Sequence, residues 1–519
     1  RAIDMATKEY DLFKAQVRQK GEEAVAYLDE NNLKGIVLSG RPYHLDPEIN
    51  HGIPELINSL GMAVLSEDSV CHLAHMERPL RVVDQWVYHS RLYKAAEFCK
   101  NKDNLDMVQL NSFGCGLDAV TTEQVEDILN EKSKIHTVIK IDEGNNLGAA
   151  KIRLRSLKAA INERELSGVK PSQLKEKKVE YQKNTRLNTK HTLLAPQMAP
   201  VQFQFIERAM QDSGLNIVVL NNNSSEIIDE GLRYVNNDAC YPAIIVIGQL
   251  IHALKSGEYD LDNTTVLMSQ TGGGCRATNY IAFLRKALKS AGFPNVPVVS
   301  ISAQGIEDNG FKEQMNMKVL NKLVMGAVYG DLLMKVLLRV RPYESIPGSA
   351  NLLYEKWCDK CKESLKDANI RQFKKNIRDI VSDFDRLEIT DEVKPRVGLV
   401  GEILVKFSPI ANNDLIGILE REGAEAVVPE LLNFFMACAY NNIYKHKNLE
   451  GSWKSMVVSK AVVKILETYM ATYTSALKAS KRFDPPKKID NLAELTKSYV
   501  SLGNQTGEGW LLPGEMLEL

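Results

Sequence analysis

Residues 264–280 decide the fold and read Thr264-Thr265-Val266-Leu267-Met268-Ser269-Gln270-Thr271-Gly272-Gly273-Gly274-Cys275-Arg276-Ala277-Thr278-Asn279-Tyr280. The opening run of β-branched and apolar residues predicts a buried strand, and the three glycines after it let the backbone approach a ligand closely. Apolar residues at helical spacing follow in residues 281–288. Cys275 is therefore expected at the carboxyl end of a strand and at a helix N-terminus, where open α/β sheets bind ligands and a thiolate is favoured. The alternative is a glycine-rich loop that holds a buried, inert cysteine.

The composition is that of an ordinary globular protein with no general attraction for nucleic acid or membranes. Of the 519 residues, 44% are hydrophobic and 25% are charged, and the formal net charge is -1. No apolar run is long enough to span a bilayer, and no signal peptide is evident. Eight cysteines in a chain of this length form no disulfide framework, so we expect reduced thiols and a cytoplasmic location. The chain begins with Arg1, which indicates processing or a piece of a longer chain.

Strands followed by helices recur along the chain and predict an α/β fold with mainly parallel sheets. A chain of this length exceeds one hydrophobic core, so about two to four domains are expected. The alternation predicts three Rossmann-like units joined by helical connections. Strands are expected at residues 35–40, 63–65, 107–110, 137–141, 217–220, 264–269, 296–301 and 396–401.

These units divide the chain into six predicted segments. The polar, helix-prone start is expected to be a lead-in from an upstream region, and a charged stretch without a periodic apolar face is expected to be a linker. The third Rossmann-like domain is expected to be truncated. The segments are 1–28 (lead-in), 29–165 (first domain), 166–190 (linker), 191–345 (second domain), 346–390 (helical connection) and 391–519 (third domain).

An internal sequence repeat indicates that the first and third units arose by duplication. Residues 35–65 and 397–428 share apolar positions as well as proline, asparagine and glycine at a constant offset of 362 residues. The alternative is that the shared positions are ones that any strand–helix unit has, without a common origin. The shared proline, asparagine and glycine pairs are Pro47 and Pro409, Asn50 and Asn412, and Gly61 and Gly423.

Cys115, Cys240 and Cys275 are predicted to share one position: a strand, a polar or glycine-rich turn, the cysteine, and then a helix. Parallel strands place their carboxyl ends on one edge of a sheet, so ligands from separate units can converge there. Three soft thiolates with backbone N–H groups nearby suit an iron–sulfur cluster. Zinc also accepts thiolates, but structural zinc usually takes close cysteine pairs rather than ligands 125 and 35 residues apart. Three ligands instead of four would leave one iron open to substrate.

Several polar groups accompany these turns. Gly274 and Arg276 flank Cys275 and are predicted to contact the same cofactor. Arg276 and Asn279 are candidates to orient a substrate anion, with helix capping as the alternative for both. Glu143 follows a predicted strand and is either a general base or a surface carboxylate.

The remaining cysteines carry weaker signals. Cys358 and Cys361 form a C-x-x-C in a charged helical segment, where a solvated helix face is favoured over redox chemistry. Three further cysteines are expected to pack against apolar helix positions. One of them, Cys71, precedes His72 and could instead ligate a metal. These three are Cys71, Cys99 and Cys438.

Five long motifs are spread along the chain. They are Gly40-Arg41-Pro42-Tyr43-His44, Asn111-Ser112-Phe113-Gly114-Cys115, Asn236-Asn237-Asp238-Ala239-Cys240-Tyr241-Pro242, residues 270–280, and Gly503-Asn504-Gln505-Thr506-Gly507-Glu508-Gly509-Trp510. Together they resemble the dehydratase-like part of the large activase-fused relatives of 2-hydroxyacyl-CoA dehydratases. The resemblance covers nearly the whole chain and extends to the iron–sulfur subunits of those dehydratases, benzoyl-CoA reductases and double-cubane cluster proteins.

The resemblance implies ATP-driven delivery of single low-potential electrons to a cluster held between Rossmann-like domains. It implies a [4Fe-4S] cluster on Cys115, Cys240 and Cys275, and it is compatible with a double-cubane cluster in the full-length protein. The implied partners are an ATP-dependent activase region or protein, a ferredoxin or flavodoxin as electron donor, and a second copy in a homodimer. The actin-like activase region that precedes this part in the family is absent from the sequence.

Three functions of different classes follow from these patterns. The first is an iron–sulfur enzyme that reduces a small molecule or a CoA thioester at an open iron site. The second is an electron-transfer or cluster-carrier protein without its own substrate, and the third is a metal-free α/β binding module. Iron and sulfide analysis separates the third from the others, and substrate-dependent oxidation of a reduced cluster separates the first two.

Overall fold

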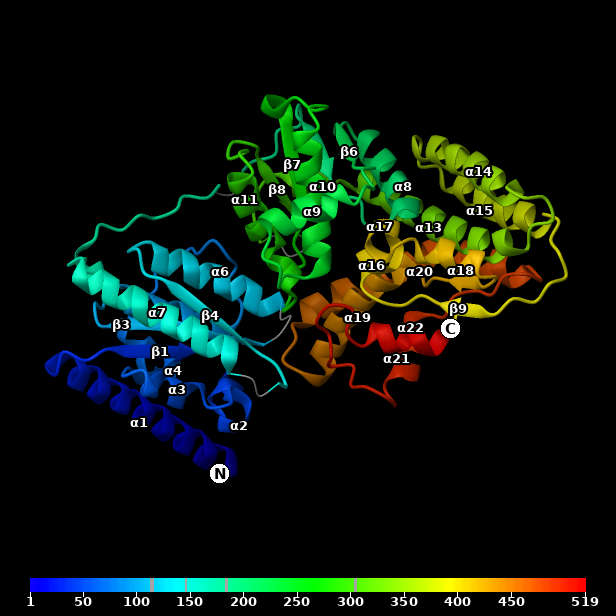
Figure 1. The fold of residues 1–519 in the computed structure, drawn as a ribbon. Helices are drawn as coiled ribbons and strands as arrows, with labels where there is room; N and C mark the ends of the chain where they lie inside the picture. Colours follow the sequence, from blue (N-terminus) through cyan, green and yellow to red (C-terminus); the bar gives the residue numbers. More distant parts are fainter. Residues whose placement is uncertain (113–115, 145–146, 183–184, 303–305) are drawn as a thin grey trace. The chain divides into compact units, whose positions relative to one another are not determined.

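The computed structural model shows an α/β protein with three all-parallel sheets of four, four and two strands in the residues that it describes (Figure 1). Those residues are 1–112, 116–144, 147–182, 185–302 and 306–519. The chain forms two compact units. Unit 1 consists of Arg1–Tyr181, Val235–Cys240 and Thr278–Lys286, and unit 2 consists of Gln182–Tyr234, Tyr241–Ala277 and Ala287–Leu519.

Unit 1 is built on a four-stranded parallel sheet with the strand order β2-β1-β3-β4. All five residues of β1 are buried, as expected for a central strand of a parallel sheet with helices on both faces. Gly35 of β1 pairs with Ala63 of β2 on one side and with Leu105 of β3 on the other. The strands are β1 (Gly35–Ser39), β2 (Ala63–Ser66), β3 (Leu105–Ser112) and β4 (His136–Ile141).

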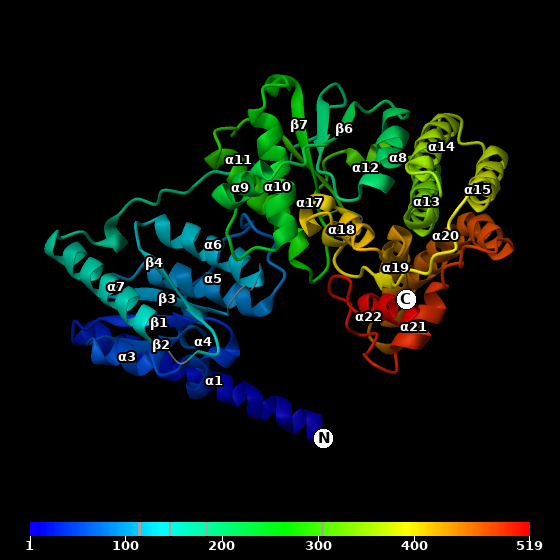
Figure 2. The same cartoon turned by 45° about the vertical axis from the view of Figure 1, so that its right-hand side comes forward.

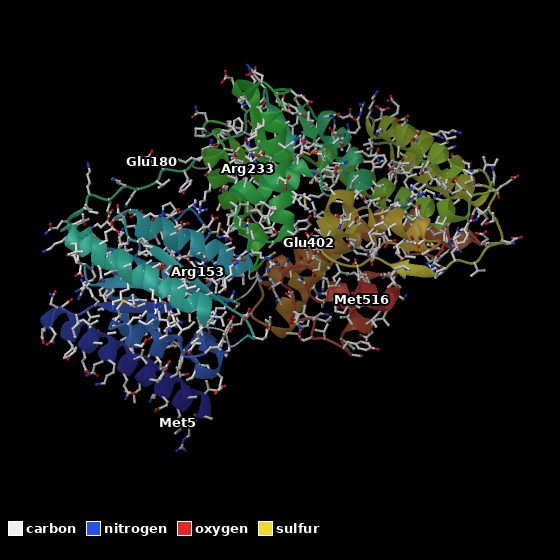
Figure 3. All side chains as sticks on the ribbon, viewed as in Figure 1. Met5, Arg153, Glu180, Arg233, Glu402 and Met516 are labelled. Carbon is white, nitrogen blue, oxygen red and sulfur yellow. The ribbon has the colours of Figure 1, made fainter. Side chains whose placement is uncertain are left out.

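Four helices cover this sheet. Leu154 and Leu157 of α7 share one apolar core with Ile36 of β1 and Val108 of β3, while α5 and α6 pack against each other and against β3. Arg153 of α7, labelled in Figure 3, donates a hydrogen bond of 3.1 Å to the carbonyl of Val138 on β4. The covering helices are α3 (Ile53–Ser59), α5 (Val87–Lys100), α6 (Gly116–Asn130) and α7 (Gly148–Leu166), and the shorter elements of the unit are η1 (Pro42–Leu45), α2 (Pro47–Asn50), α4 (Glu67–Val70), η2 (Cys71–Leu73) and η3 (Pro171–Gln173).

The first helix, α1 (Ala2–Glu30), packs on unit 1 only through its second half. Gly21, Val25 and Leu28 are buried, whereas nearly all of residues 2–20 are exposed. A methyl group added at Gly21 would lie 2.1 Å from the carbonyl oxygen of Ser69, so this glycine allows the close approach of α1 to α4. The first half of α1 extends as a single helix beyond the rest of unit 1 (Figure 2).

Unit 2 contains a second four-stranded parallel sheet with the order β6-β5-β7-β8. Its apolar core joins Leu193 of β5, Leu267 of β7 and Val299 of β8. The strands are β5 (Thr192–Ala195), β6 (Ile217–Val219), β7 (Thr264–Ser269) and β8 (Val298–Ile301). The accompanying helices are α8 (Pro200–Gln211), α9 (Glu226–Tyr234), α10 (Tyr241–Lys255), η4 (Leu261–Asn263), η5 (Arg276–Asn279), α11 (Tyr280–Ser290) and α12 (Phe311–Gln314). The residues of η5 and α11 are divided between the two units.

The two four-stranded sheets have the same topology. In each sheet the first strand in the sequence lies between the second and the third, and the fourth follows at the edge beyond the third. The strand order therefore reverses between β1 and β3 and again between β5 and β7. Open α/β sheets bind ligands at the carboxyl ends of the strands beside such a reversal.

The rest of unit 2 is a helical layer with a two-stranded parallel sheet. Trp357, Phe373 and Tyr473 are nearly fully buried in one large apolar core formed by these helices. The helices are α13 (Met317–Val340), η6 (Arg341–Tyr343), α14 (Ser349–Leu365), α15 (Ile370–Asp385), α16 (Ile403–Phe407), α17 (Pro409–Asn412), α18 (Leu415–Arg421), α19 (Leu431–Asn448), α20 (Trp453–Ala479), α21 (Ile489–Thr496) and α22 (Leu511–Glu518), and the strands are β9 (Arg396–Gly398) and β10 (Glu425–Val427).

The predicted internal repeat is visible in the boundaries of the elements. Helices α2 and α3 begin at Pro47 and Ile53, and α17 and α18 begin 362 residues later at Pro409 and Leu415. The paired strands β1–β2 and β9–β10 frame these helices in both places. Pro47 and Pro409 each occupy the first turn of a four-residue helix, where the missing N–H is tolerated.

Asn50 and Asn412 make hydrogen bonds of the same kind in the two copies. The side-chain amide of Asn50 donates to the His44 carbonyl at 3.3 Å and accepts from the Gly52 N–H at 3.0 Å. The amide of Asn412 donates to the Val405 carbonyl at 2.9 Å and accepts from the Leu415 N–H at 3.1 Å. Each asparagine therefore ties the turn before its helix to the start of the next helix. The two sets of contacts are of the same kind, with each partner one residue away from the 362-residue offset, and they support the duplication.

Most of the predicted strands are present, and the α/β fold with parallel sheets is confirmed. Strands β5 and β10 had no counterpart among the expected strands. The Rossmann-like character of the units and the six segment boundaries remain predictions. Within the described part of the chain, we find no helix that is both long and apolar enough to cross a bilayer.

Candidate functional site

Two of the sequence motifs meet at the strand-order reversal of the first sheet. The turn after β1 carries Tyr43 and His44, and β3 ends at Ser112. Tyr43 Oη lies 2.6 Å from Ser112 Oγ, and His44 Nε2 lies 3.4 Å from the same atom. Arg41 Nε donates to Asp118 Oδ1 of α6 at 3.1 Å. The site is thus formed by the loops that follow the two central strands.

His44 is held as a neutral hydrogen-bond donor. Its Nδ1 accepts the Arg41 backbone N–H at 3.0 Å, so the proton of the neutral ring lies on Nε2, the atom nearest Ser112. The pKa of His44 is lowered to about 4, because burial and the Arg41 charge outweigh the attraction of the protonated ring to Asp118. The imidazole therefore presents an N–H to the site at neutral pH.

Asp118 supplies the negative charge of this site. Its carboxylate accepts from Arg41 Nε and from the Ser112 N–H at 3.3 Å, and His89 Nε2 lies 3.8 Å from Oδ1. Burial opposes ionisation, but His89, Arg41 and the Ser112 N–H together lower the pKa of Asp118. His89 is 6% exposed and packs edge-on against Trp86, with the ring centroids 5.0 Å apart. Within the described residues, neither ring nitrogen of His89 has a hydrogen-bond partner.

Cys240 lies in a turn that reaches the carboxyl edge of the first sheet. Asn236 Oδ1 accepts the Asp238 N–H at 2.9 Å, and Lys140 near the end of β4 donates to Asp238 Oδ1 at 2.6 Å. The predicted strand before Cys240 is wrong, because α9 ends at Tyr234 and separates β6 from this turn. The predicted helix after it is confirmed, since α10 begins at Tyr241.

Cys275 lies in the predicted loop of unit 2. Strand β7 ends at Ser269 and η5 begins at Arg276, so the strand, glycine loop, cysteine and helix follow in the expected order. The thiol of Cys275 is half-buried, and Gly274 and Arg276 are exposed. Cys115 lies outside the described residues, and the sequence places it between the end of β3 at Ser112 and the start of α6 at Gly116. The predicted convergence of the three cysteines therefore stays a prediction.

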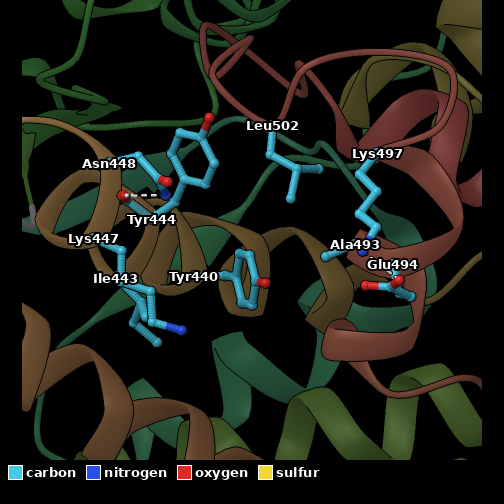
Figure 4. A pocket seen from close by; sticks show the side chains of 9 residues that line it. All are labelled: Tyr440, Ile443, Tyr444, Lys447, Asn448, Ala493, Glu494, Lys497 and Leu502. Atoms are coloured by element: carbon cyan, nitrogen blue, oxygen red, sulfur yellow. Dashed lines mark hydrogen bonds and ion pairs between the residues drawn. The ribbon is translucent and has the colours of Figure 1, made fainter.

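The glycine loop of unit 2 adjoins the 503–510 segment. A methyl group added at Gly274 would lie 3.6 Å from Thr506 Oγ1. The segment is anchored by Trp510, whose Nε1 donates to Asn441 Oδ1 at 2.7 Å and whose ring lies 5.5 Å from that of Tyr440. Between α19 and α21, a cavity of about 220 Å³ is bordered by Tyr440 and Lys497 (Figure 4).

Glu402 marks the carboxyl end of the third sheet. It follows β9, and its side chain accepts the Val405 N–H at 3.2 Å at the start of α16 (it is labelled in Figure 3). Glu508 of the 503–510 segment accepts the Ile403 N–H at 3.3 Å. Burial and the charge of Glu508 raise the pKa of Glu402 to about 7.

Asn279 has another role than expected, whereas Glu143 follows its strand as the sequence predicted. Asn279 is fully buried and clamps the backbone of Val83: it accepts the N–H at 2.7 Å and donates to the carbonyl at 3.3 Å. Asn279 is therefore neither a substrate ligand nor a helix cap. Glu143 is exposed beyond the end of β4.

Four of the other cysteines are buried and unsuited to act as thiolates. Burial raises the pKa of Cys99 to about 12 and that of Cys358 to about 11, and it also raises the pKa of Cys71 and Cys361. The predicted solvated face for Cys358 and Cys361 is wrong, because both thiols lie in the helical core of unit 2. Packing is confirmed for Cys71 and Cys99, whereas Cys438 is exposed.

Comparison with known proteins identifies one part of the chain. Residues 1–70 match the CoA enzyme activase uncharacterised domain (DUF2229). This match covers α1, β1, β2 and the helices between them, and it includes the 41–44 turn of the site. No curated protein and no solved structure matches the chain.

The sequence reasoning missed most of the polar residues of the first site. Asp118 and His89 lie on helices, so the approach of Asp118 to Arg41 and of His89 to Asp118 depends on how α5 and α6 pack against the sheet. His44 and Ser112 were visible only as parts of two separate motifs. The available signal was topological, since both motifs follow predicted parallel strands whose carboxyl ends share one edge. No group of three histidine, cysteine or acidic side chains that could hold a metal ion is found in the described part of the chain.

Proposed function

We propose that this chain is the electron-accepting partner of a CoA enzyme activase and holds a [4Fe-4S] cluster on Cys115, Cys240 and Cys275. The match of residues 1–70 to an activase-associated domain supports the activase link. When bound, such a cluster supplies one-electron reduction of a small molecule or a CoA thioester. The chain supplies the ligands, the electrostatics of the site and the groups that orient a substrate.

One observation carries this proposal. The two four-stranded sheets have the same strand order, and in each a predicted cysteine ligand follows the third strand and directly precedes a helix. Cys115 precedes Gly116 of α6, and Cys275 precedes Arg276 of η5. Equivalent positions in two similar sheets are what a site assembled from both would need.

The exposure of the thiols also fits a cluster. Metal ligation requires thiolates, which are disfavoured in dry apolar surroundings. Cys240 and Cys275 are half-buried, in contrast to the four cysteines packed into apolar cores. Cys240 directly precedes α10, and the N–H groups at the start of this 15-residue helix favour negative charge.

The donors beside Ser112 are suited to the oxygen of a bound acyl group. His44 Nε2 and the hydroxyls of Tyr43 and Ser112 lie together at the edge where the chain continues to Cys115. One of the two hydroxyls donates to the other, so one O–H remains for a ligand beside the imidazole N–H. Neutral donors in a partly buried site can hold a carbonyl oxygen without adding charge. We assign these side chains the role of orienting the substrate.

The test is anaerobic purification of the chain followed by electron transfer from a CoA enzyme activase. ATP-dependent reduction of the bound iron, read by electron paramagnetic resonance, supports the proposal. Iron that is reduced equally well without ATP or without the activase contradicts the activase link. Oxidation of the reduced cluster by an added CoA thioester separates the enzyme from a carrier protein without its own substrate.

A further inference from the structure

The first half of α20 carries an apolar face that is exposed, which we call the α20 face. Its five large side chains are 40–62% exposed, whereas Leu466, Met470 and Tyr473 on the opposite side of the helix are buried in the helical core of unit 2. The exposed residues recur at i, i+4, i+5, i+8, i+9 and i+12, so they share one side of the helix. They are Trp453, Val457, Val458, Ala461, Val462 and Ile465.

The shape of the α20 face fits a second helix. It runs from Trp453 to Ile465, a length of about 18 Å at a rise of about 1.5 Å per residue. Ala461 lies midway between Val457 and Ile465 on one row of the face, so its methyl group leaves a notch between two larger side chains. A helix that crosses at Ala461 can approach closely and pack its side chains beside the notch. A lipid surface has no use for such a notch.

The charges on the α20 face are all positive. No acidic residue occurs in residues 453–465, and Glu450 and Glu467 lie beyond the two ends. The three lysines within this range form no salt bridge with a carboxylate of the described residues. Two of them are one helical turn apart and lie along the same edge of the face. The lysines are Lys454, Lys460 and Lys464, of which the last two share the edge.

A second copy of this chain cannot complement that charge through the same face. A two-fold symmetric pair would place one α20 face against the other, so lysines would meet lysines. Like charges that are brought together in a contact oppose association. The occupant of the α20 face therefore carries carboxylates beside its apolar residues.

We propose that the α20 face binds an amphipathic helix of a partner protein, in which an apolar row is flanked by carboxylates. The apolar row packs across Ala461, as amphipathic helices do on apolar surfaces of their partners. The carboxylates pair with the ammonium groups of Lys460 and Lys464 and fix the direction of the bound helix. The interaction is independent of the proposed cluster, and a chain without iron retains it.

The test is a fluorescence anisotropy titration of the full chain with two synthetic helical peptides of about 18 residues, long enough to span the face. The first peptide has a row of leucines flanked by glutamates, and its twin has lysines in place of the glutamates. We expect the acidic peptide to bind about tenfold or more tightly than the basic twin. The difference should shrink at high salt, which screens the charge pairs.

Two pairs of variants locate the binding on α20. Val458→Glu should weaken binding of the acidic peptide by about tenfold or more, because it places a carboxylate within the apolar contact. Leu352→Glu is the matched control, since Leu352 is 69% exposed on α14 of the same unit, and it should change the affinity by less than about twofold. Lys460→Glu should weaken the acidic peptide and favour the basic twin, whereas Lys356→Glu on α14 should do neither.

The proposal is overturned if the acidic peptide does not bind, if the two peptides bind equally, or if the α20 and α14 variants weaken binding equally. Vesicles of phosphatidylcholine and phosphatidylglycerol are the third probe, and binding to them that Val458→Glu abolishes would overturn the proposal in favour of a membrane surface. A dimer in sedimentation that Val458→Glu dissociates would overturn it in favour of a second copy. Circular dichroism of each variant confirms that it is folded.

Discussion

His44 Nε2 lies 3.4 Å from Ser112 Oγ, although the two residues are 68 positions apart in the chain. The contact joins the loop after β1 to the end of β3, the two strands between which the order of the first sheet reverses. It also brings together two motifs that the sequence shows only as separate stretches.

His44→Asn should remove part of the acid sensitivity of unit 1. The pKa of His44 is lowered to about 4 in the folded protein from 6.5, so between these pH values the unfolded chain binds more protons. This contribution to stability is complete above pH 6.5 and is lost as the pH falls toward 4. Each unit of pKa difference corresponds to about 1.4 kcal/mol. The asparagine oxygen can still accept the Arg41 N–H.

The measurement is the free energy of unfolding in urea at several pH values. The unmodified chain should lose more stability than His44→Asn between pH 6.5 and pH 4. Parallel pH dependences would show that the ring titrates normally in the folded state.

Glu402→Gln should reveal a pH dependence of the opposite sign, between about pH 4.5 and pH 7. The pKa of Glu402 is raised to about 7 from 4.5, so the folded chain binds more protons between these values and stability falls as the pH rises. Glutamine keeps an acceptor for the Val405 N–H but carries no charge. At pH 8 the variant should be more stable than the unmodified chain by about 1–3 kcal/mol. A difference in unfolding free energy between Glu402→Gln and the unmodified chain that is the same at pH 8 and at pH 4.5 would contradict the burial of this charge.

Asn279→Ala should destabilise unit 1 by about 1–3 kcal/mol, because the Val83 N–H and carbonyl both lose their partner. Asn263→Ala is a suitable comparison, since the Asn263 side chain makes an exposed hydrogen bond to Asp260. Its cost should stay below about 0.5 kcal/mol. Similar losses of unfolding free energy in the two variants would show that the clamp on Val83 adds nothing special.

Gly248→Ala should separate the helices on either side of the Cys240 turn. A methyl group at Gly248 would lie 1.9 Å from the Ile227 carbonyl oxygen of α9, and one at Gly231 would lie 2.1 Å from the Ile244 carbonyl oxygen of α10. Backbone atoms cannot yield as a flexible side chain does, so we expect a loss of about 1–3 kcal/mol or more in denaturant unfolding. Gly273→Ala, where an added methyl meets nothing within 4 Å, should be neutral for stability. A neutral Gly248→Ala would mean that the helices pack less closely than described.

The sequence was sufficient for the elements whose pattern is local. The apolar run before Gly272 predicted β7, and the residues shared at an offset of 362 predicted the repeat in which α2 and α17 occupy equivalent places. The strand predicted before Cys240 was wrong because residues 226–234 form an amphipathic helix between β6 and the turn.

The polar contacts of the site depend on tertiary packing and have little local signal. Asp118 follows ordinary helix-start chemistry, and only the folded sheet places it beside Arg41. The C-x-x-C of α14 illustrates the same limit, because charged neighbours indicated a solvent-facing helix while α13 and α15 bury both thiols. Which face of such a helix is buried depends on the elements that pack against it.

The most direct test of the central claim is iron and acid-labile sulfide quantification after anaerobic reconstitution of the full chain and its cysteine variants. The account predicts about four irons per unmodified chain and loss of the bound iron in Cys115→Ala, Cys240→Ala and Cys275→Ala. Cys438→Ala is the matched control: its thiol is exposed and is not a predicted ligand, so this variant should keep its iron. An unmodified chain that binds no iron, or any of these three variants that binds as much iron as the control, would contradict the account.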